Sequence, residues 1–452
     1  MTPTTKAVRV LIVDDSSVVR KLLTSALTAH PEIEVVGTAA NGILGLAKVM
    51  QLEPEAVILD IEMPEMDGIA TLTKLRKTHP RLPVIMFSTL TQRGADVTFD
   101  ALAAGASDYV LKPSTQNGET LEGVVSSSLV PKLLALARSR PSAPGKSEGT
   151  VGALERNVFE ARAASKQMAG LSAKPAALAG PALGSAPPTG TKPMLRPEAS
   201  RFPSRPSVNL QVPAGLRPDP GALAKSVKAS MPHASQPVVG GPAFQALLRK
   251  QIQIIVIASS TGGPNALAEV LPRLPKQLPV PIVLVQHMPP IFTRCLAERL
   301  NLRSELDVLE SAGGELLRAG SIYIAPGNRH LELQRAPDGV RTLLSDGPQE
   351  NSCRPAADVL FRSAARCYGA GVLAVVLTGM GQDGARGARE IRDAGGRVLV
   401  QSGPTCVVWG MPKAVEDSGL AEAVVPLSEM AAAILQRVAL GLHPLRLRED
   451  DP

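Results

Sequence analysis

The stretch Val8-Arg-Val-Leu-Ile-Val-Asp-Asp15 decides how the first part of the chain folds. A nearly continuous apolar run of this length is typical of a strand that is buried on both faces, as in a parallel sheet covered by helices. Ser16 or Ser17 can cap the helix that we expect at 17–28. The stretch therefore predicts the first strand–helix unit of an α/β domain.

The same alternation of strand and helix patterns continues to residue 140. Five units of this kind predict a doubly wound parallel sheet. We expect further strands at 33–38, 56–59, 84–87 and 108–111, and further helices at 43–51, 69–78, 94–104 and 122–138.

A second α/β domain begins at the apolar run Ile252-Gln-Ile-Ile-Val-Ile257. The pattern predicts another doubly wound sheet, with an antiparallel excursion around 321–345. We expect strands at 281–285, 306–310, 321–325, 330–334, 341–345, 371–377 and 397–401, and helices at 292–301, 355–367, 384–394, 411–417 and 427–440. The predicted organisation is a first domain over 7–125, a helix end and linker over 126–248, and a second domain over 249–442.

The linker differs from both domains in composition and charge. Residues 141–248 hold 16 of the 40 prolines, which remove backbone donors and block regular elements. Residues 141–250 hold 14 Lys and Arg against 5 Asp and Glu, which gives this segment a net charge of +9. The whole chain has a net charge of +7, so the residues outside the segment together carry about −2. We therefore interpret the basic charge as a property of a flexible, solvated linker. A segment attracted to acidic partners or to a membrane surface is the alternative.

The composition also narrows the class of protein. Aromatic residues make up 2% of the chain, which disfavours the stacking surfaces that bind single-stranded nucleic acid. The four cysteines form no Cys-x-x-Cys pair, so they indicate neither a zinc knuckle nor a redox motif. The start carries no apolar signal segment, and no run approaches the roughly 20 apolar residues of a membrane helix. We expect a cytoplasmic protein that does not bind nucleic acid.

A first candidate site combines charged and hydroxyl side chains at the ends of predicted strands. The carboxyl ends of parallel strands form one crevice, so these side chains should converge there. Crowded carboxylates need a hard cation such as Mg²⁺, and a carboxylate can attack a phosphoryl donor to form an aspartyl phosphate. A lysine can bind the new phosphate and a hydroxyl can follow it. The residues are Asp14, Asp15, Asp60, Ser88 and Lys112.

A second candidate site lies where Ile257-Ala-Ser-Ser-Thr-Gly-Gly-Pro264 leaves a strand. A serine between a strand end and a helix N-terminus has free N–H groups nearby that can stabilise an oxyanion. His287 and Asp383 also follow predicted strands, so the three could converge as a Ser–His–Asp set, with His287 as the base and Asp383 holding its tautomer. Alone, the loop could cradle a phosphate, the histidine could be structural and Asp383 could belong to a turn. His330 is a rival histidine, for which we favour a structural or substrate-edge role.

Residues 7–125 resemble the response-regulator receiver family, which has a flavodoxin-like five-stranded parallel sheet. The resemblance rests on the acidic pair Asp14-Asp15, on Leu59-Asp-Ile-Glu62 and on Tyr109-Val-Leu-Lys-Pro113. It implies that Asp60 accepts the phosphoryl group and that Asp14, Asp15, Asp60 and the backbone of Glu62 hold Mg²⁺. It further implies that Ser88 and Tyr109 form the switch pair, that Lys112 contacts the phosphate, and that the peptide bond before Pro113 is cis.

Residues 251–440 resemble the chemotaxis protein-glutamate methylesterases (CheB). The matching motifs are Ser-Thr-Gly-Gly, Gln286-His-Met-Pro-Pro290, Tyr323-Ile-Ala-Pro-Gly327, Leu377-Thr-Gly-Met-Gly-Gln-Asp-Gly384 and Gly410-Met-Pro412. The resemblance makes Ser260, and not Ser259, the nucleophile, with His287 as the base, Asp383 as the orienting acid and the N–H of Met380 as an oxyanion donor. It implies hydrolysis of glutamate methyl esters on chemoreceptors, and also deamidation of receptor glutamines, without a cofactor in the esterase site.

The two resemblances together imply a phosphorylation-activated hydrolase of a two-component chemosensory pathway. A chemosensory histidine kinase would supply the phosphoryl group, and the enzyme would work at the edge of membrane-bound receptor arrays. We expect the unphosphorylated receiver to cover the Ser260 crevice and block the substrate. A non-enzymatic adaptor and a transcriptional regulator are the alternatives, although no helix-turn-helix pattern with a basic recognition helix is apparent.

Overall fold

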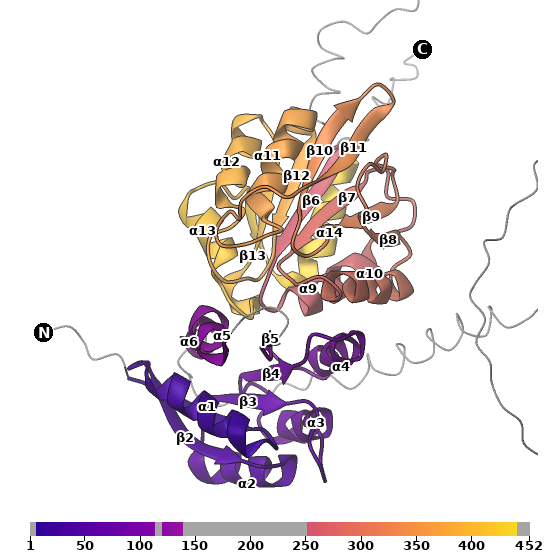
Figure 1. Cartoon of the computed structure of the whole chain (residues 1–452). Helices are drawn as coiled ribbons and strands as arrows, with labels where there is room; N and C mark the ends of the chain where they lie inside the picture. Colours follow the sequence, from indigo (N-terminus) through magenta and orange to yellow (C-terminus); the bar gives the residue numbers. More distant parts are fainter. Residues whose placement is uncertain (1–5, 114–119, 139–250, 441–452) are drawn as a thin grey trace, which may run out of the picture. The chain divides into compact units, whose positions relative to one another are not determined.

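The computed structural model describes residues 6–113, 120–138 and 251–440, which belong to one compact unit (Figure 1). Of the predicted helix end and linker over 126–248, residues 139–248 lie outside the described residues, so the linker stays a prediction. Among the described helices, none combines the length and the apolar character needed to cross a bilayer.

The first domain is a five-stranded parallel sheet in the order β2-β1-β3-β4-β5. Its strands are β1 (Val8–Val13), β2 (Ile33–Ala39), β3 (Ala56–Asp60), β4 (Val84–Ser88) and β5 (Asp108–Leu111). Its helices are α1 (Ser17–Thr28), α2 (Gly42–Leu52), α3 (Gly68–Thr78), α4 (Gln92–Ala103) and α5 (Leu121–Val124), which runs through the π-helical turn η1 (Val125–Leu129) into α6 (Val130–Arg138). Helix α1 packs with α5 and η1, whereas α3 packs between α2 and α4. The predicted doubly wound receiver sheet is confirmed.

The second domain is a seven-stranded parallel sheet in the order β14-β13-β12-β6-β7-β9-β8, with a separate hairpin of β10 and β11. The strands are β6 (Ile254–Ser259), β7 (Ile282–Gln286), β8 (Asp307–Glu310), β9 (Ser321–Ile324), β10 (His330–Ala336), β11 (Gly339–Ser345), β12 (Val372–Val376), β13 (Arg397–Gln401) and β14 (Ala423–Val425). The helices are α9 (Gly263–Val270), α10 (Phe292–Arg303), α11 (Ala357–Tyr368), α12 (Ala385–Asp393), α13 (Met411–Asp417) and α14 (Leu427–Leu440), with short helical turns η2 (Leu271–Arg273), η3 (Gly369–Gly371) and η4 (Gly403–Thr405).

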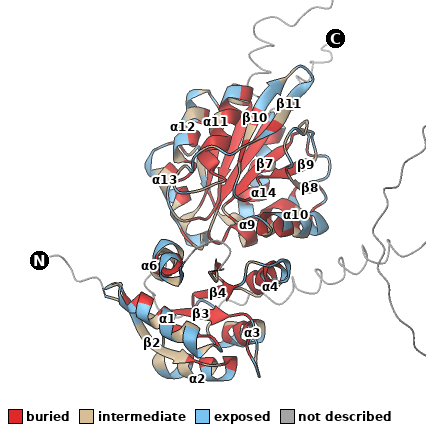
Figure 2. Cartoon of the chain, viewed as in Figure 1, coloured by how far each residue is buried: buried red, intermediate tan, exposed pale blue. Residues whose placement is uncertain are grey.

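The central strand β6 shows why this sheet is buried on both faces. Ile255 and Ile257 lie in one apolar cluster with residues of α9, α10 and α14, whereas Val256 and Ala258 lie in another with residues of α11. Alternate side chains of a strand point to opposite faces, so an all-apolar strand fills two cores. Figure 2 shows the buried residues concentrated on the strands and the exposed residues on the outer sides of the helices.

The structure corrects two details of the sequence prediction. The antiparallel pairing joins β10 to β11, and β11 to a bridge at Leu316, whereas β9 pairs in parallel with β7 and β8. Among the described residues the cis peptide bond precedes Pro355, and the bond before Pro113 is not cis.

The order of the strands places a switch point in each sheet. In the first sheet the chain leaves β1 towards β2 and returns to β3 on the other side, and in the second it leaves β6 towards β7 and returns to β12. Ligands of open α/β sheets bind outside the carboxyl ends of the strands at such points. Both candidate sites follow these strands.

Candidate active site and phosphoacceptor site

The loop between β6 and α9 distinguishes its two serines. The Oγ of Ser259 is fully buried and donates to Oε1 of Gln286 at 2.7 Å, so this hydroxyl is already used inside the fold. Ser260 is half-buried, and its backbone is held at both ends. The N–H of Ser260 donates to the carbonyl of Thr378 at 3.0 Å, and the carbonyl of Ser260 accepts from Nε2 of Gln286 at 2.9 Å. The next residues need glycine, since Gly262 has a φ of +77° and a Cβ there would lie 2.5 Å from Val407.

His287 and Asp383 form a hydrogen-bonded pair. The Nε2 of His287 lies 2.8 Å from Oδ2 of Asp383, and the backbone N–H of His287 donates to the carbonyl of Ser259 at 3.2 Å. Because a carboxylate can only accept, Nε2 carries the hydrogen and Nδ1 is the nitrogen left to accept a proton. His287 follows β7 and Asp383 lies in the loop after β12. Strand β6, which leads into the loop of Ser260, lies between these two strands in the sheet.

The carboxylate of Asp383 is buried, but it accepts several hydrogen bonds from the protein. Burial alone would raise its pKa, yet the hydrogen bonds from His287 and from the backbone at the start of α11 lower it overall. The helix N-terminus contributes in the same sense. The donors are Nε2 of His287 and the N–H of Ala357 to Oδ2, and Nδ2 of Asn351 and the N–H groups of Asp358 and Gly384 to Oδ1.

Cys353 is a neighbour of the histidine that the sequence analysis missed. Its Sγ lies 3.6 Å from Nδ1 of His287. Burial lowers the pKa of His287, but the contacts with Asp383 and Cys353 have the larger combined effect in the opposite direction and raise this pKa to about 10. No motif among those quoted above included the segment 350–355, and neither Cys353 nor Asn351 has a spacing that would have marked it.

The loop of Met380 is fixed next to Ser260. The backbone N–H of Gly379 donates to the carbonyl of Val408. The carbonyl of Gly379 accepts from the N–H groups of Gly410 and Met411, at 3.0 and 2.8 Å. A Cβ on Gly379 would lie 2.8 Å from the Cβ of Ser260, so the two loops are in close contact and glycine is required.

His330, the rival histidine, is a structural residue. It is 2% exposed, its Nε2 lies 2.9 Å from the carbonyl of Pro348, and its Nδ1 accepts from the N–H of Ala356 at 3.2 Å. Both ring nitrogens therefore already have backbone partners.

The acidic pocket of the first domain brings together the predicted carboxylates. Oxygens of Asp14, Asp15 and Asp60 all lie within 4.8 Å of one another. Nζ of Lys112 lies 2.8 Å from Asp60 and 3.2 Å from Asp14. Burial raises the pKa of Asp60 to about 6 against the opposing effect of Lys112, whereas the two carboxylates raise the pKa of Lys112 overall in spite of burial.

These residues fit a divalent cation. The Oδ2 atom of Asp14 is buried and has an ion pair with Lys112 but no hydrogen-bond donor. A cluster of hard carboxylate oxygens with an unsatisfied oxygen is what Mg²⁺ prefers. The side chain of Glu62 instead points to Arg93 at 3.9 Å, which leaves its backbone as the candidate ligand.

Ser88 and Tyr109, the predicted switch pair, have different surroundings. The Oγ of Ser88 accepts from Thr98 at 2.7 Å inside the first domain. The ring of Tyr109 stacks on Phe292 of α10, with ring centroids 4.8 Å apart and planes 5° apart. Next to it, Asp108 accepts from the hydroxyl of Thr261 at 2.7 Å and pairs with Lys132. Strand β5 therefore contacts the residue that follows Ser260.

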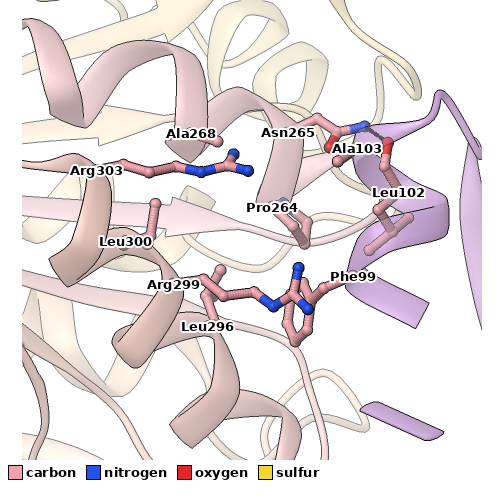
Figure 3. Close-up of a pocket in the computed structure, with 10 residues that line it drawn as sticks. All are labelled: Phe99, Leu102, Ala103, Pro264, Asn265, Ala268, Leu296, Arg299, Leu300 and Arg303. Carbon is pink, nitrogen blue, oxygen red and sulfur yellow. Dashed lines mark hydrogen bonds between the residues drawn. The ribbon is translucent and has the colours of Figure 1, made fainter. Parts of the chain in front are cut away.

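Helix α4 of the first domain also contacts the second domain. Figure 3 shows the amide of Asn265 directed at the carbonyl of Leu102, at 3.0 Å, and the guanidinium of Arg299 beside the ring of Phe99, 5.4 Å from its centroid. Arg299 also pairs with Asp100 at 2.7 Å. The cavity between them has a volume of about 30 Å³, which is room for one water molecule. These helices are therefore in close contact here.

Comparisons with known proteins agree with this division. The CheB methylesterase family matches residues 255–434, and the response regulator receiver domain matches residues 10–121. A protein-glutamate methylesterase/protein-glutamine glutaminase of Nocardioides sp. is 43% identical over 96% of both chains, and one of Trichodesmium erythraeum is 38% identical over 95% of this chain and 99% of its own. The crystal structure of the Thermotoga maritima CheB methylesterase catalytic domain is 44% identical, covers 42% of this chain and 99% of that chain, and has a TM-score of 0.41. The chain therefore belongs to the protein-glutamate methylesterase/protein-glutamine glutaminase family, the CheB adaptation enzymes of chemotaxis, with an N-terminal response-regulator receiver domain.

Proposed function

We propose that Ser260, His287 and Asp383 hydrolyse γ-methyl esters of glutamate on chemoreceptors. The observation that carries this proposal is the bonded pair of His287 and Asp383. The backbone N–H of His287 donates to the carbonyl of the residue before the half-buried Ser260. Nδ1 of His287 takes the proton as Oγ of Ser260 attacks the ester carbonyl carbon, and the carbonyl electron pair moves to oxygen. The N–H of Met380 stabilises that oxyanion.

Collapse of the tetrahedral intermediate breaks the bond to the methoxy oxygen. His287 returns its proton to that oxygen, so methanol leaves and an acyl-serine remains. Water, deprotonated by the same nitrogen, then attacks the acyl carbon. The bond from that carbon to Oγ breaks, and His287 returns the proton to Oγ, so the glutamate carboxylate leaves and Ser260 is restored. With a receptor glutamine the leaving group is ammonia, which gives the same acyl-enzyme.

We further propose that Asp60 is the phosphorylation site and that a chemosensory histidine kinase is the donor. Asp14, Asp15, Asp60 and the backbone of Glu62 would hold Mg²⁺, which offsets charge on the transferring phosphoryl group when bound. Lys112 is already within 2.8 Å of Asp60, where it would bind the new phosphate. With these substrates and this donor, the enzyme would work at the cytoplasmic face of receptor arrays.

The contacts of β5 support regulation by release of the receiver. Phosphorylation would draw Ser88 towards the phosphate and let Tyr109 turn from its stack on Phe292. That movement would loosen the neighbouring contact of Asp108 with Thr261, next to the nucleophile. A local charge would thus bias a two-state contact.

The experiment is methanol release from methylated receptor cytoplasmic fragments, with wild type, Ser260→Ala and a chain lacking residues 1–140, each with and without acetyl phosphate and Mg²⁺. We expect activity that requires Ser260, rises with the phosphodonor and is high without the receiver. Activity that survives Ser260→Ala would refute the catalytic assignment, and a truncated chain no more active than the unphosphorylated one would refute the blocking contact. An adaptor without hydrolase activity would also fail to react with a fluorophosphonate at Ser260.

A further inference from the structure

A tight turn reaches the catalytic pair from outside the sheet. The backbones of Glu350 and Cys353 bond to each other in both directions, at 3.2 and 2.9 Å. The two residues between them, Asn351 and Ser352, have φ values of +52° and +60°, as the tip of a type I′ turn requires. The base of the turn is tied to α11 by an ion pair of Glu350 with Arg362. An asparagine tolerates this backbone better than most residues.

The side chain of Asn351 is inserted between two carboxylates. Its Nδ2 donates to Oδ1 of Asp383 at 2.9 Å and to Oδ2 of Asp358 at 2.9 Å. An amide nitrogen has two hydrogens, so one side chain satisfies both acceptors and cannot flip without facing its oxygen towards them. Asp358 is fully buried, and its other oxygen accepts from the N–H of Gly387 at 2.7 Å. The amide is therefore held at both ends.

We propose that Asn351 and Asp358 are positioning residues for the hydrolysis, with Asn351 holding Oδ1 of Asp383 so that Oδ2 stays directed at Nε2 of His287. This inference rests on the proposed function of the catalytic pair. Fixing the carboxylate fixes the tautomer of His287, because Nε2 must then donate and Nδ1 of the neutral ring carries no hydrogen. The same turn places Cys353 3.6 Å from Nδ1, so one turn contacts both ends of the pair.

The charges around the pair determine what variants should do. His287 faces the carboxylate of Asp383 from the loop after β12 and the thiol of Cys353 from the turn. Asp358 on α11 is bridged to Asp383 by Asn351. Farther out, Arg362 pairs with Glu350 and also faces the charge of Glu390. An extra negative charge at position 351 should favour the protonated histidine, and loss of the charge at position 358 should disfavour it.

The test uses the full-length chain, activated with acetyl phosphate and Mg²⁺, and compares the wild type with four test variants and one control variant. Asn351→Ala removes the bridge, Asn351→Asp adds a charge, Asp358→Asn removes one, and the double variant restores the net charge. Ser352→Gly is the control, because Ser352 is exposed in the same turn and glycine keeps its positive φ. Methanol release gives kcat, KM and the pH at which kcat/KM is half-maximal on its acid side, and thermal unfolding checks the fold.

We expect Asn351→Ala to lower kcat about ten- to a hundred-fold with KM nearly unchanged, since misplacing a catalytic group by about 1 Å can cost a hundred-fold. Asn351→Asp should move the acid side of the profile to higher pH, Asp358→Asn should move it to lower pH, and the double variant should return it towards wild type.

Two outcomes would overturn the inference. One is a kcat for Asn351→Ala equal to that of Ser352→Gly, and the other is an acid side that moves in neither direction in the charge variants. If the buried Asp358→Asn variant does not fold, Asn351→Ala and Asn351→Asp still decide, because position 351 is only half-buried. Activity that persists in Ser260→Ala would instead refute the proposed function, so the two failures are distinguishable.

Discussion

Replacing Asp383 by asparagine should disable the enzyme through the wrong histidine tautomer. The two carboxylate oxygens accept five hydrogen bonds, three on Oδ1 and two on Oδ2. An asparagine offers only one acceptor, and placing its oxygen on the side with three donors turns its NH₂ towards Nε2 of His287. Nε2 must then accept, so the hydrogen moves to Nδ1 and that nitrogen can no longer take the proton of Ser260.

The expected loss is large in both rate and stability. A wrong tautomer in a Ser–His–Asp set lowers kcat about 10⁴-fold, which corresponds to about 5.4 kcal/mol of transition-state stabilisation. Two charge-assisted hydrogen bonds are also lost, at roughly 1.5–3 kcal/mol each, so the free energy of unfolding should fall by about 3–6 kcal/mol. The direction agrees with the lowered pKa of Asp383, which indicates that the fold stabilises its anion.

The assay is methanol release in the presence of acetyl phosphate, at a temperature where thermal unfolding shows that the variant is folded. Asp393→Asn, an exposed carboxylate at the end of α12, is the matched control and should keep wild-type activity. A folded Asp383→Asn enzyme with kcat within ten-fold of wild type would refute the reasoning, because the histidine would then not depend on this carboxylate.

Three further changes test the rest of the argument. Asp60→Asn should abolish activation by acetyl phosphate while leaving the unstimulated rate of methanol release intact; activation that persists would place the phosphoryl group elsewhere. Arg299→Ala removes both the ion pair with Asp100 and the contact with the ring of Phe99. It should raise the unstimulated rate up to about thirty-fold, since an exposed pair contributes about 1 kcal/mol or less and a cation–π contact about 0.5–1 kcal/mol. Arg294→Ala on the same helix should not raise the rate, because its ion pair stays within the second domain. Because Cys353 raises the pKa of His287, Cys353→Ala should lower that pKa, so the neutral base persists to lower pH and kcat/KM begins to rise at lower pH; an unmoved profile would show that the thiol does not act on the histidine.

The sequence predicted the strand ends well because they follow from simple patterns. Buried parallel strands are continuous apolar runs, and the residues that follow them lie at one edge of the sheet by the geometry of the fold. Asp14, Asp15 and Asp60 came together for this reason, and so did His287 and Asp383. The roles of these residues are a separate matter, which the variants address.

What the sequence did not predict depends on contacts between distant segments. Asn351 meets Asp383 across 32 positions, and its turn has no apolar period to mark it. Strand β9 was assigned to an antiparallel region because a short strand after a glycine-rich loop has no signal for its direction. Strand β14 was not predicted, because it is only three residues long. Pairing partners are set by tertiary packing, which a local pattern does not contain.

The short strand β5 is the route by which the proposed phosphorylation of Asp60 would act on Ser260. Lys112, which contacts Asp60, directly follows the strand, and Asp108 and Tyr109, which contact the second domain, begin it. With only four residues from Asp108 to Leu111, a shift at one end is carried to the other, because backbone bonds to β4 keep the strand rigid. The hydroxyl of Thr261, one residue after Ser260, would lose its acceptor in the same movement. We therefore expect release of the receiver and readjustment of the nucleophile loop to occur together, as one event with two consequences.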